Sequence, residues 1–212
     1  RRLRRRRAVM IVIIDYGRGN LFSIEQALRH LRADYSVSGD PALIAGANRL
    51  ILPGVGAFGD AMQTLFARGL VEPIRQSARR GIPLLGICLG MQLLFERSVE
   101  FGEHAGLALI KGSVGPLPSG DMRVPNVGWR KLVPNLGNKM LEDVESDTMV
   151  YFVHSFVARP ADPSVVAATI PFNGENATIA VASGNIAGYQ FHPEKSGHVG
   201  LALLEKFVSA DI

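Results

Sequence analysis

Short, uninterrupted apolar runs that alternate with helical patterns constrain the fold of this chain more than any other feature. The runs lie at Met10–Ile14, Arg49–Leu52 and Leu84–Ile87. A strand without polar alternation must be covered on both faces, as in a parallel sheet between helices. The segments that follow the runs carry apolar residues at helical spacing: Leu21, Ile24, Leu28 and Leu31, with Asn20 as N-cap; Met62, Leu65, Phe66, Leu70 and Ile74; and Met91, Leu93, Leu94 and Phe95. We therefore predict an α/β fold with three layers, in which helices flank a mostly parallel central sheet.

The second half of the chain has a different pattern, with short β-like runs between Gly, Pro and Asn residues. These runs are Leu107–Ile110, Trp129–Leu132, Met149–Val153, Val165–Ile170, Thr178–Ala182 and Ile186–Phe191. The break at residues 183–185, Ser-Gly-Asn, predicts a hairpin, and residues 199–208 predict a final helix. An additional antiparallel β region is therefore expected. We expect residues 10–212 to form a single domain, because 212 residues suffice for one sizeable core.

The charge of the chain is concentrated in its first seven residues, of which six are arginine. Without these six, the formal net charge of +4 becomes −2, so the basic balance does not indicate a nucleic-acid partner. We interpret residues 1–9 as an Arg-rich leader that is disordered or not native, with a natural start at Met10. The apolar run after it is too short for a signal peptide. No run reaches the ~18–20 apolar residues that a membrane-spanning helix requires.

The single cysteine, Cys88, occurs in Gly86-Ile87-Cys88-Leu89-Gly90, where a predicted strand meets a predicted helix. This is the G-x-nucleophile-x-G pattern of a sharp turn between a strand and a helix. The flanking residues are glycines because larger side chains would collide with the turn. N–H groups at the start of the helix favour the reactive thiolate. A buried cysteine that acts as a small hydrophobic residue fits the pentapeptide equally well. A lone cysteine also excludes an intramolecular disulfide, which agrees with a reducing cytoplasm.

A nucleophile needs a base, and His192 is the best candidate among the five histidines. It closes an apolar run and precedes Pro193 and Glu194. In an extended segment, residues two apart point to the same side, so Glu194 can reach the imidazole. A carboxylate that orients a histidine, which deprotonates a cysteine, is a catalytic triad. The alternative is a structural histidine at the end of a strand.

The segment Gly54–Gly59 matches the G-x-G-x-x-G pattern of dinucleotide-binding sites. However, it follows the second strand instead of the first, and Pro53 stands immediately before it. The acidic residue nearest the required spacing, Glu72, lies in a helical stretch and not at a strand end. Backbone N–H groups of such a turn can instead stabilise an oxyanion. We favour that interpretation, because this loop and Cys88 both follow strands at the same edge of a parallel sheet.

With these segments in place, the chain resembles the class I, or triad-type, glutamine amidotransferases over residues 10–209. The elbow at Cys88 and the His192-Pro193-Glu194 motif mark the class. Within it, the chain resembles the glutaminase subunits of imidazole glycerol phosphate synthases. That closer likeness is carried by the segments Asp15–Asn20, Pro53–Phe58, Gly86–Phe95, Asn126–Trp129, Tyr151–Ser155 and Gln190–Ser196. The Arg-rich leader departs from the pattern but touches none of these motifs.

The resemblance implies a role for each matching residue. Cys88 would attack the side-chain amide of L-glutamine and form a thioester, His192 would pass the proton to ammonia, and Glu194 would orient His192. Oxyanion donors would come from the backbone of Gly54, Val55, Gly56 and Leu89. Glutamine contacts would be Gln92 and Glu100, by their places on the helix after the elbow, together with His154, Ser155 and Phe156. Contacts with a partner subunit would be Asn20, Tyr151 and Lys195.

The resemblance also implies a partner and a compartment. The ammonia would pass to a cyclase subunit with a TIM-barrel fold, in a heterodimer that makes imidazole glycerol phosphate and aminoimidazole carboxamide ribotide in histidine biosynthesis. It implies no cofactor, no metal, no nucleic acid and no membrane, and a cytoplasmic location.

Three other functions remain open from the sequence. The glutaminase of pyridoxal phosphate synthase shares the elbow, but it is expected to carry a Gly-Gly-Glu-Ser type loop where this chain has Pro53–Gly56. A cysteine peptidase or other thiol hydrolase would use the same triad without a synthase partner. A non-enzymatic nucleotide-binding module would use Gly54–Gly59.

Overall fold

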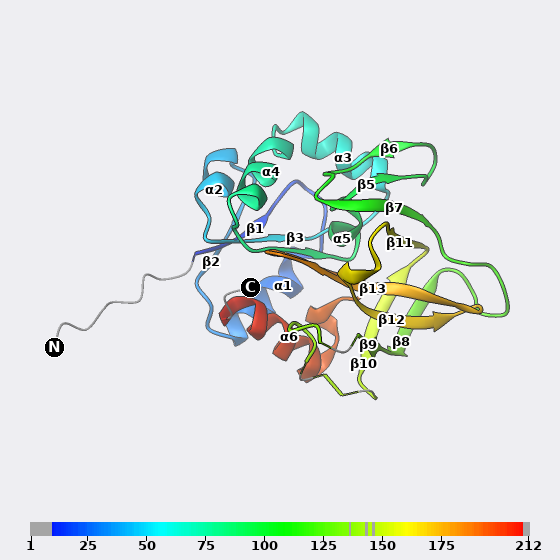
Figure 1. Cartoon of the computed structure of the whole chain (residues 1–212). Helices are drawn as coiled ribbons and strands as arrows, with labels where there is room; N and C mark the ends of the chain where they lie inside the picture. The colour runs from blue at the N-terminus through cyan, green and yellow to red at the C-terminus, as the bar shows by residue number, and fades with distance from the viewer. Residues whose placement is uncertain (1–9, 136, 143, 146, 210–212) are drawn as a thin grey trace.

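The computed structural model describes residues 10–135, 137–142, 144–145 and 147–209, and the predicted leader at residues 1–9 lies outside this part (Figure 1). One half of the main sheet is parallel, in the order β2-β1-β3-β4-β14. These strands are β1 (Ile11–Ile14), β2 (Tyr35–Ser38), β3 (Arg49–Leu52), β4 (Leu84–Ile87) and β14 (Ile186–Tyr189).

Helices cover both faces of this parallel half, as Figure 1 shows. On one face lie α2 (Pro41–Gly46), α3 (Phe58–Ala67) and α4 (Val71–Arg79), and on the other lie α1 (Leu21–His30) and α6 (Gly197–Ser209). Alternate residues of β1 enter the two cores: Ile11 and Ile13 pack with the α1 and α6 side, and Val12 and Ile14 with the α2–α4 side. The predicted three-layer α/β fold is thus confirmed.

Beyond β14 the sheet continues with β13-β11-β7-β5-β6, and β12 pairs with both β13 and β9. Most of these pairings are antiparallel, although β5 and β7 are parallel. A separate antiparallel pair is formed by β8 and β10. The bounds are β5 (Phe95–Ser98), β6 (His104–Ala105), β7 (Ile110–Pro116), β8 (Asn126–Lys131), β9 (Val133–Pro134), β10 (Met149–His154), β11 (Phe156–Pro160), β12 (Val166–Phe172) and β13 (Glu175–Ser183). The predicted antiparallel region is confirmed, as is the hairpin, in which Ser183 pairs with Ile186.

Two helix predictions need correction. The helical stretch through residues 62–74 is two helices, because the chain turns at Gly69, whose φ of +66° suits glycine. The helix predicted through Phe95 ends earlier: α5 spans Leu89–Leu93, and Phe95 begins β5. Pairing with the chain near Leu107–Ile110 overrides the helical spacing, because Leu107 N–H donates to the Leu93 carbonyl at 2.8 Å.

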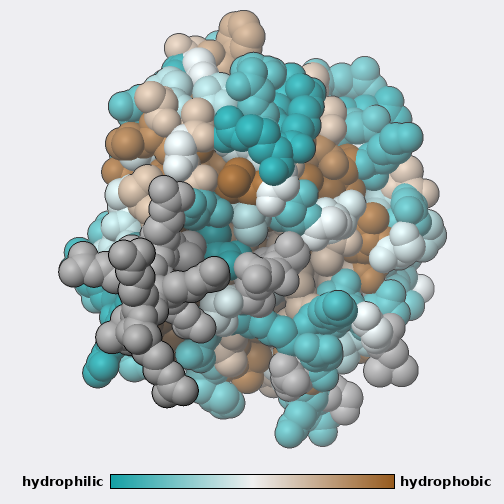
Figure 2. Space-filling model, turned by 60° about the vertical axis from the view of Figure 1, so that its left-hand side comes forward, coloured by the Kyte–Doolittle hydropathy of each residue, from teal (hydrophilic) through white to brown (hydrophobic). Residues whose placement is uncertain are grey.

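The surface seen in Figure 2 is a mosaic in which separate hydrophobic patches alternate with hydrophilic residues. None of the described helices is long and apolar enough to cross a membrane.

Candidate active site

The elbow between β4 and α5 places Cys88 in a strained conformation, with φ +56° and ψ −114°. Its N–H donates to the Tyr189 carbonyl at 2.7 Å, which ties the turn to the end of β14. Glycine is required on both sides. A Cβ on Gly86 would lie 2.6 Å from the Gly90 carbonyl oxygen, and a Cβ on Gly90 would lie 1.8 Å from the Leu52 oxygen. The sequence prediction that larger side chains would collide with this turn is therefore confirmed.

His192 lies in the segment that leaves the neighbouring strand, with Glu194 in the short 3-10 helix Pro193–Lys195. The imidazole Nδ1 is 2.8 Å from Glu194 Oε1, and both side chains are almost fully buried. The imidazole Nε2 is buried and has no hydrogen-bond partner among the described residues. Burial lowers the pKa of His192, but the neighbouring Cys88 and Glu194 outweigh it and raise the pKa from 6.5 to about 9.

Cys88 and His192 share a cavity of about 330 Å³. The wall of this cavity is made of Val55, Gly56, Cys88, Leu89, Gln92, Glu100, Pro125, Val153, His154, Ser155, Phe156 and His192. The cavity thus gathers most of the predicted catalytic, oxyanion and substrate residues. Gly54 and Glu194 lie outside the wall: Gly54 packs on the elbow, and Glu194 stands behind His192. The roles of these residues stay predictions.

The glycine loop after β3 is anchored at both ends. The Tyr16 hydroxyl donates to the Pro53 carbonyl at 3.0 Å, and Glu100 Oε2 accepts from the Phe58 N–H at 2.7 Å. Burial raises the pKa of Tyr16, so its hydroxyl stays protonated.

Glu100 was expected on the helix after the elbow, and this placement is wrong. It lies in the turn after β5, because the helix ends at Leu93.

His154 lies in the cavity as a neutral ring whose protons can be assigned. Arg130 Nε donates to Asn126 Oδ1 at 3.0 Å, so Asn126 turns its Nδ2 toward His154 Nε2, 2.9 Å away. The proton of His154 is therefore on Nδ1, which donates to the Phe156 carbonyl at 2.8 Å. Burial lowers the pKa of His154 from 6.5 to about 4. Both ring nitrogens of His154 are thus engaged in hydrogen bonds, whereas Nε2 of His192 has no such partner among the described residues.

The residues predicted to contact a partner lie outside the cavity wall. Asn20 caps α1, as predicted, by accepting from the Ser23 N–H at 3.4 Å. Tyr151 is half-buried on β10 and makes an edge-on contact with Trp129, and Lys195 is exposed in the His192 segment. Their role at an interface remains a prediction.

A larger cavity of about 620 Å³ lies between α3, α4 and β6. It contains His104 and Glu103, but Cys88, the only cysteine, is not among the residues that line it. The chemistry of the smaller cavity, and not its size, identifies it as the candidate active site.

Several supporting residues were not predicted to have a role. Tyr16, Asn126 and Gln190 belong to motifs that the sequence singled out, but their contacts cross between distant segments. Ser196 does the same: its hydroxyl donates to the His192 carbonyl at 2.6 Å and accepts from the Tyr151 N–H at 3.0 Å. The sequence signal that could have identified them is a buried polar residue inside a motif.

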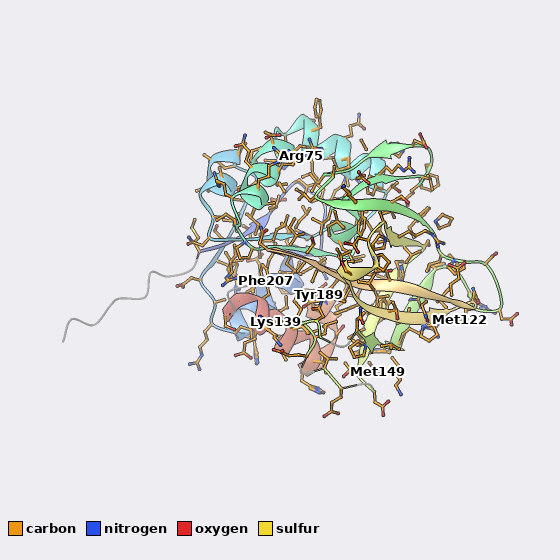
Figure 3. The ribbon with its side chains drawn as sticks, in the orientation of Figure 1. Arg75, Met122, Lys139, Met149, Tyr189 and Phe207 are labelled. Atoms are coloured by element: carbon orange, nitrogen blue, oxygen red, sulfur yellow. The ribbon has the colours of Figure 1, made fainter. Side chains whose placement is uncertain are left out.

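Figure 3 shows Tyr189, whose backbone carbonyl anchors Cys88, beside Phe207 in the core on the α6 side.

The fold and the site together define an α/β protein with a thiol, imidazole and carboxylate grouped where parallel strands end. Solved structures share this fold. "Crystal structure of glutamine amidotransferase" superposes with a TM-score of 0.73 and 20% identity, over 95% of this chain and all of that chain. "Structure of PurLQS from Thermotoga maritima" gives a TM-score of 0.73 and 19% identity, over 95% and 98% of the two chains.

Sequence comparison is more specific. Residues 12–210 match the family "Glutamine amidotransferase class-I". The chain is 42% identical to "Imidazole glycerol phosphate synthase subunit HisH 1" of Legionella pneumophila (strain Paris), over 93% of this chain and 98% of the relative. It is 47% identical to "Imidazole glycerol phosphate synthase subunit HisH" of Syntrophotalea carbinolica, with the same coverage. The chain therefore belongs to the class-I glutamine amidotransferases and, within them, to the HisH subunits of imidazole glycerol phosphate synthase.

Proposed function

We propose that the chain hydrolyses L-glutamine to glutamate and ammonia and supplies the ammonia to the cyclase subunit of imidazole glycerol phosphate synthase, in the cytoplasm. The observation that carries the proposal is the shared cavity of Cys88 and His192, together with Glu194, which holds the imidazole from behind at 2.8 Å. The names of the relatives support the choice of partner.

The geometry supports a two-step acyl transfer through Cys88. The thiolate attacks the amide carbon of glutamine, and the developing oxyanion is held by backbone N–H groups of Leu89 and the Gly54–Gly56 loop. His192, protonated and held by Glu194, gives its Nε2 proton to the leaving nitrogen, which departs as ammonia. Water then loses a proton to His192 and attacks the thioester carbon. The products are glutamate and the regenerated Cys88 thiolate.

The cavity also offers acceptors for the α-ammonium group of an amino acid. Gln92 uses its Nε2 for the Phe156 carbonyl and for Gln190, at 3.2 and 2.8 Å, which leaves Oε1 as its remaining polar atom. Glu100 uses one oxygen for the Phe58 N–H and lines the cavity as well. A carboxylate and an amide oxygen favour a positively charged group over a neutral peptide N–H. These contacts favour free glutamine over a peptide substrate.

We propose that the partner is a TIM barrel and forms a heterodimer with this chain. Its docking surface would include Asn20, Tyr151 and Lys195, and the exposed side of the β8–β10 pair next to them. Ammonia released at Cys88 must leave the cavity before it is protonated by water. A partner seated over this region would receive it directly.

The test is to measure glutamate released from glutamine by the full chain, alone and with a cyclase subunit and its nucleotide ligand. We expect low activity from the chain alone and a large increase in the complex. Cys88→Ala should abolish glutamate release, a loss of at least about 10³-fold. Gly46→Ala, at the end of α2 with no atom within 4 Å of the added Cβ, is the control and should keep full activity.

Two results would contradict the proposal. Strong glutaminase activity that ignores the cyclase and its nucleotide would exclude the assigned partner. Glutamate release by Cys88→Ala would exclude the triad.

A further inference from the structure

Gln190 is a buried polar side chain beside the nucleophile that the mechanism above does not use. It is fully buried and lies between the end of β14 and His192. Its Nε2 is 3.8 Å from Cys88 Sγ, and its Oε1 accepts a hydrogen bond of 2.8 Å from Gln92 Nε2. A buried side-chain amide whose oxygen and nitrogen both make polar contacts needs an explanation for each of the two contacts.

Neighbouring groups fix which end of the Gln190 amide faces the sulfur. The Phe156 carbonyl oxygen can only accept, so the Gln92 atom that lies 3.2 Å from it must be the Nε2 donor. The same Nε2 is 2.8 Å from Gln190, which must therefore present its Oε1. Gln190 then turns Nε2 toward Cys88. The reverse orientation would bring two N–H donors face to face.

The Cys88 sulfur can accept from Gln190 Nε2 in either protonation state, but it can donate only as a thiol. As a thiol, it can donate to the Val153 carbonyl, 3.9 Å from Sγ. As a thiolate, it has no proton to donate, and it accepts from Gln190 Nε2. A hydrogen bond made to the charged form of a group favours that form, and such bonds to an ion are stronger than neutral ones.

We propose that Gln190 stabilises the ionised Sγ of Cys88 by donating from Nε2, and that Gln92 and Phe156 hold it in that orientation. The inference rests on the proposed role of Cys88 as nucleophile. It assigns Gln190 a task separate from that of His192, which moves the proton. It also gives Gln92 a second task, because its Nε2 orients Gln190 while its Oε1 remains for substrate.

The test is the alkylation rate of Cys88 by iodoacetamide as a function of pH, in the full chain without glutamine or partner. Only the thiolate reacts, forming a thioether and releasing iodide. Because Cys88 is the single cysteine, the rate reports one sulfur. Gln190→Met keeps the length of the side chain and removes the donor, and Gln190→Glu places a carboxylate beside the sulfur. We expect the midpoint of the rate profile to rise by about one pH unit in the first variant and further in the second.

The control is Gln63→Met, an exposed glutamine on α3, which should leave the midpoint unchanged. An unchanged midpoint in both Gln190 variants would overturn the inference. This holds even if the alkylation rate of a variant is lower than that of the wild type by the same factor at every pH. If the midpoint shifts although the wild-type complex releases no glutamate, the proposed function fails and this inference stands.

A second measurement covers variants that do not fold. In the ¹⁵N-glutamine-labelled wild-type chain, the side-chain amide protons of Gln190 should change chemical shift across the same midpoint. After alkylation of Cys88 that change should disappear. A shift that does not depend on pH before alkylation would overturn the inference.

Discussion

Glu194 is one of the two residues, with Cys88, that raise the pKa of His192 in the proposed active site. Its side chain is fully buried, and its Oε1 holds His192 Nδ1 at 2.8 Å. A neighbouring anionic group favours the imidazolium, and Cys88 and Glu194 together outweigh the burial of His192 and place its pKa near 9. His192 therefore keeps its proton through neutral pH, in the form that can protonate a leaving nitrogen. Above about pH 9 it loses this proton, so activity should decline on the alkaline side.

Glu194→Gln tests this assignment through the pH profile of glutamate release by the complex. The amide carries no charge, so the pKa of His192 should fall and the alkaline limb should move to lower pH by about one unit or more. The maximum rate should fall by on the order of 10²-fold, because the imidazole loses its orientation. Glu145→Gln, an exposed glutamate, should leave the profile unchanged. An alkaline limb that stays in place would show that another group sets it.

At the scale of helices and strands, the sequence correctly predicted the strands that are buried on both faces. β3 and β4 match the apolar runs Arg49–Leu52 and Leu84–Ile87, and β1 matches four of the five residues in Met10–Ile14. Such strands read as continuous apolar segments. β2 was not predicted, because it is an edge strand of Tyr35-Ser36-Val37-Ser38 in which every residue is partly exposed.

Residues of the candidate site could likewise be predicted only where the signal lies within one segment of the chain. Cys88, His192 and Glu194 could be proposed because their own local segments, an elbow and a His-x-Glu motif, carry the signal. The expected contact of Glu194 with His192 is present, but the extended geometry expected for it was wrong, because Glu194 lies in the 3-10 helix Pro193–Lys195. The contacts of Gln190 could not, since they join segments about 100 positions apart in the chain. Glu100 was predicted to lie on the helix after Cys88, and this was wrong for a related reason. The chain after Leu93 leaves the helix and pairs with β7, which comes later in the sequence.

The contact between α5 and β3 supports a prediction at this scale. A Cβ on Gly90 would lie 1.8 Å from the Leu52 carbonyl oxygen, so Gly90→Ala must push the elbow away from β3. We expect a loss of about 3 kcal/mol, or a fall in Tm on the order of 6–12 °C, together with loss of glutaminase activity. Thermal unfolding followed by circular dichroism measures it.

Gly46→Ala is the matched control for Gly90→Ala, because its added Cβ meets nothing within 4 Å. Its Tm should stay the same or rise slightly, by the equivalent of about 0.5 kcal/mol. A Gly90→Ala chain as stable as the Gly46→Ala chain would mean that α5 can shift without cost.

At the scale of the whole molecule, the β8–β10 pair has an apolar side that no described element covers. Successive residues along each strand point alternately inward and outward, so Phe152 is buried while Trp129 and Val153 are 50% and 42% exposed. Apolar side chains exposed together indicate an interaction surface. Val153 also lines the cavity of Cys88, so this surface reaches the site where ammonia would form. The pair lies at one end of the molecule, away from α2 (Figure 1).

Trp129→Ala tests whether the cyclase covers this surface. A half-exposed tryptophan that becomes buried in an interface is typical of the residues that dominate binding energy, so its truncation should weaken the complex by about 2 kcal/mol, or roughly 30-fold in Kd. The isolated chain should keep its Tm, because Trp129 is half-exposed and its ring meets Tyr151 edge-on on the same side of the strand pair. Phe66→Ala, which removes another exposed aromatic ring on α3, should leave Kd unchanged. Isothermal titration calorimetry with the cyclase measures both variants. If Trp129→Ala binds as tightly as wild type, the partner sits elsewhere, and ammonia would have to leave the cavity by a route that does not pass Val153.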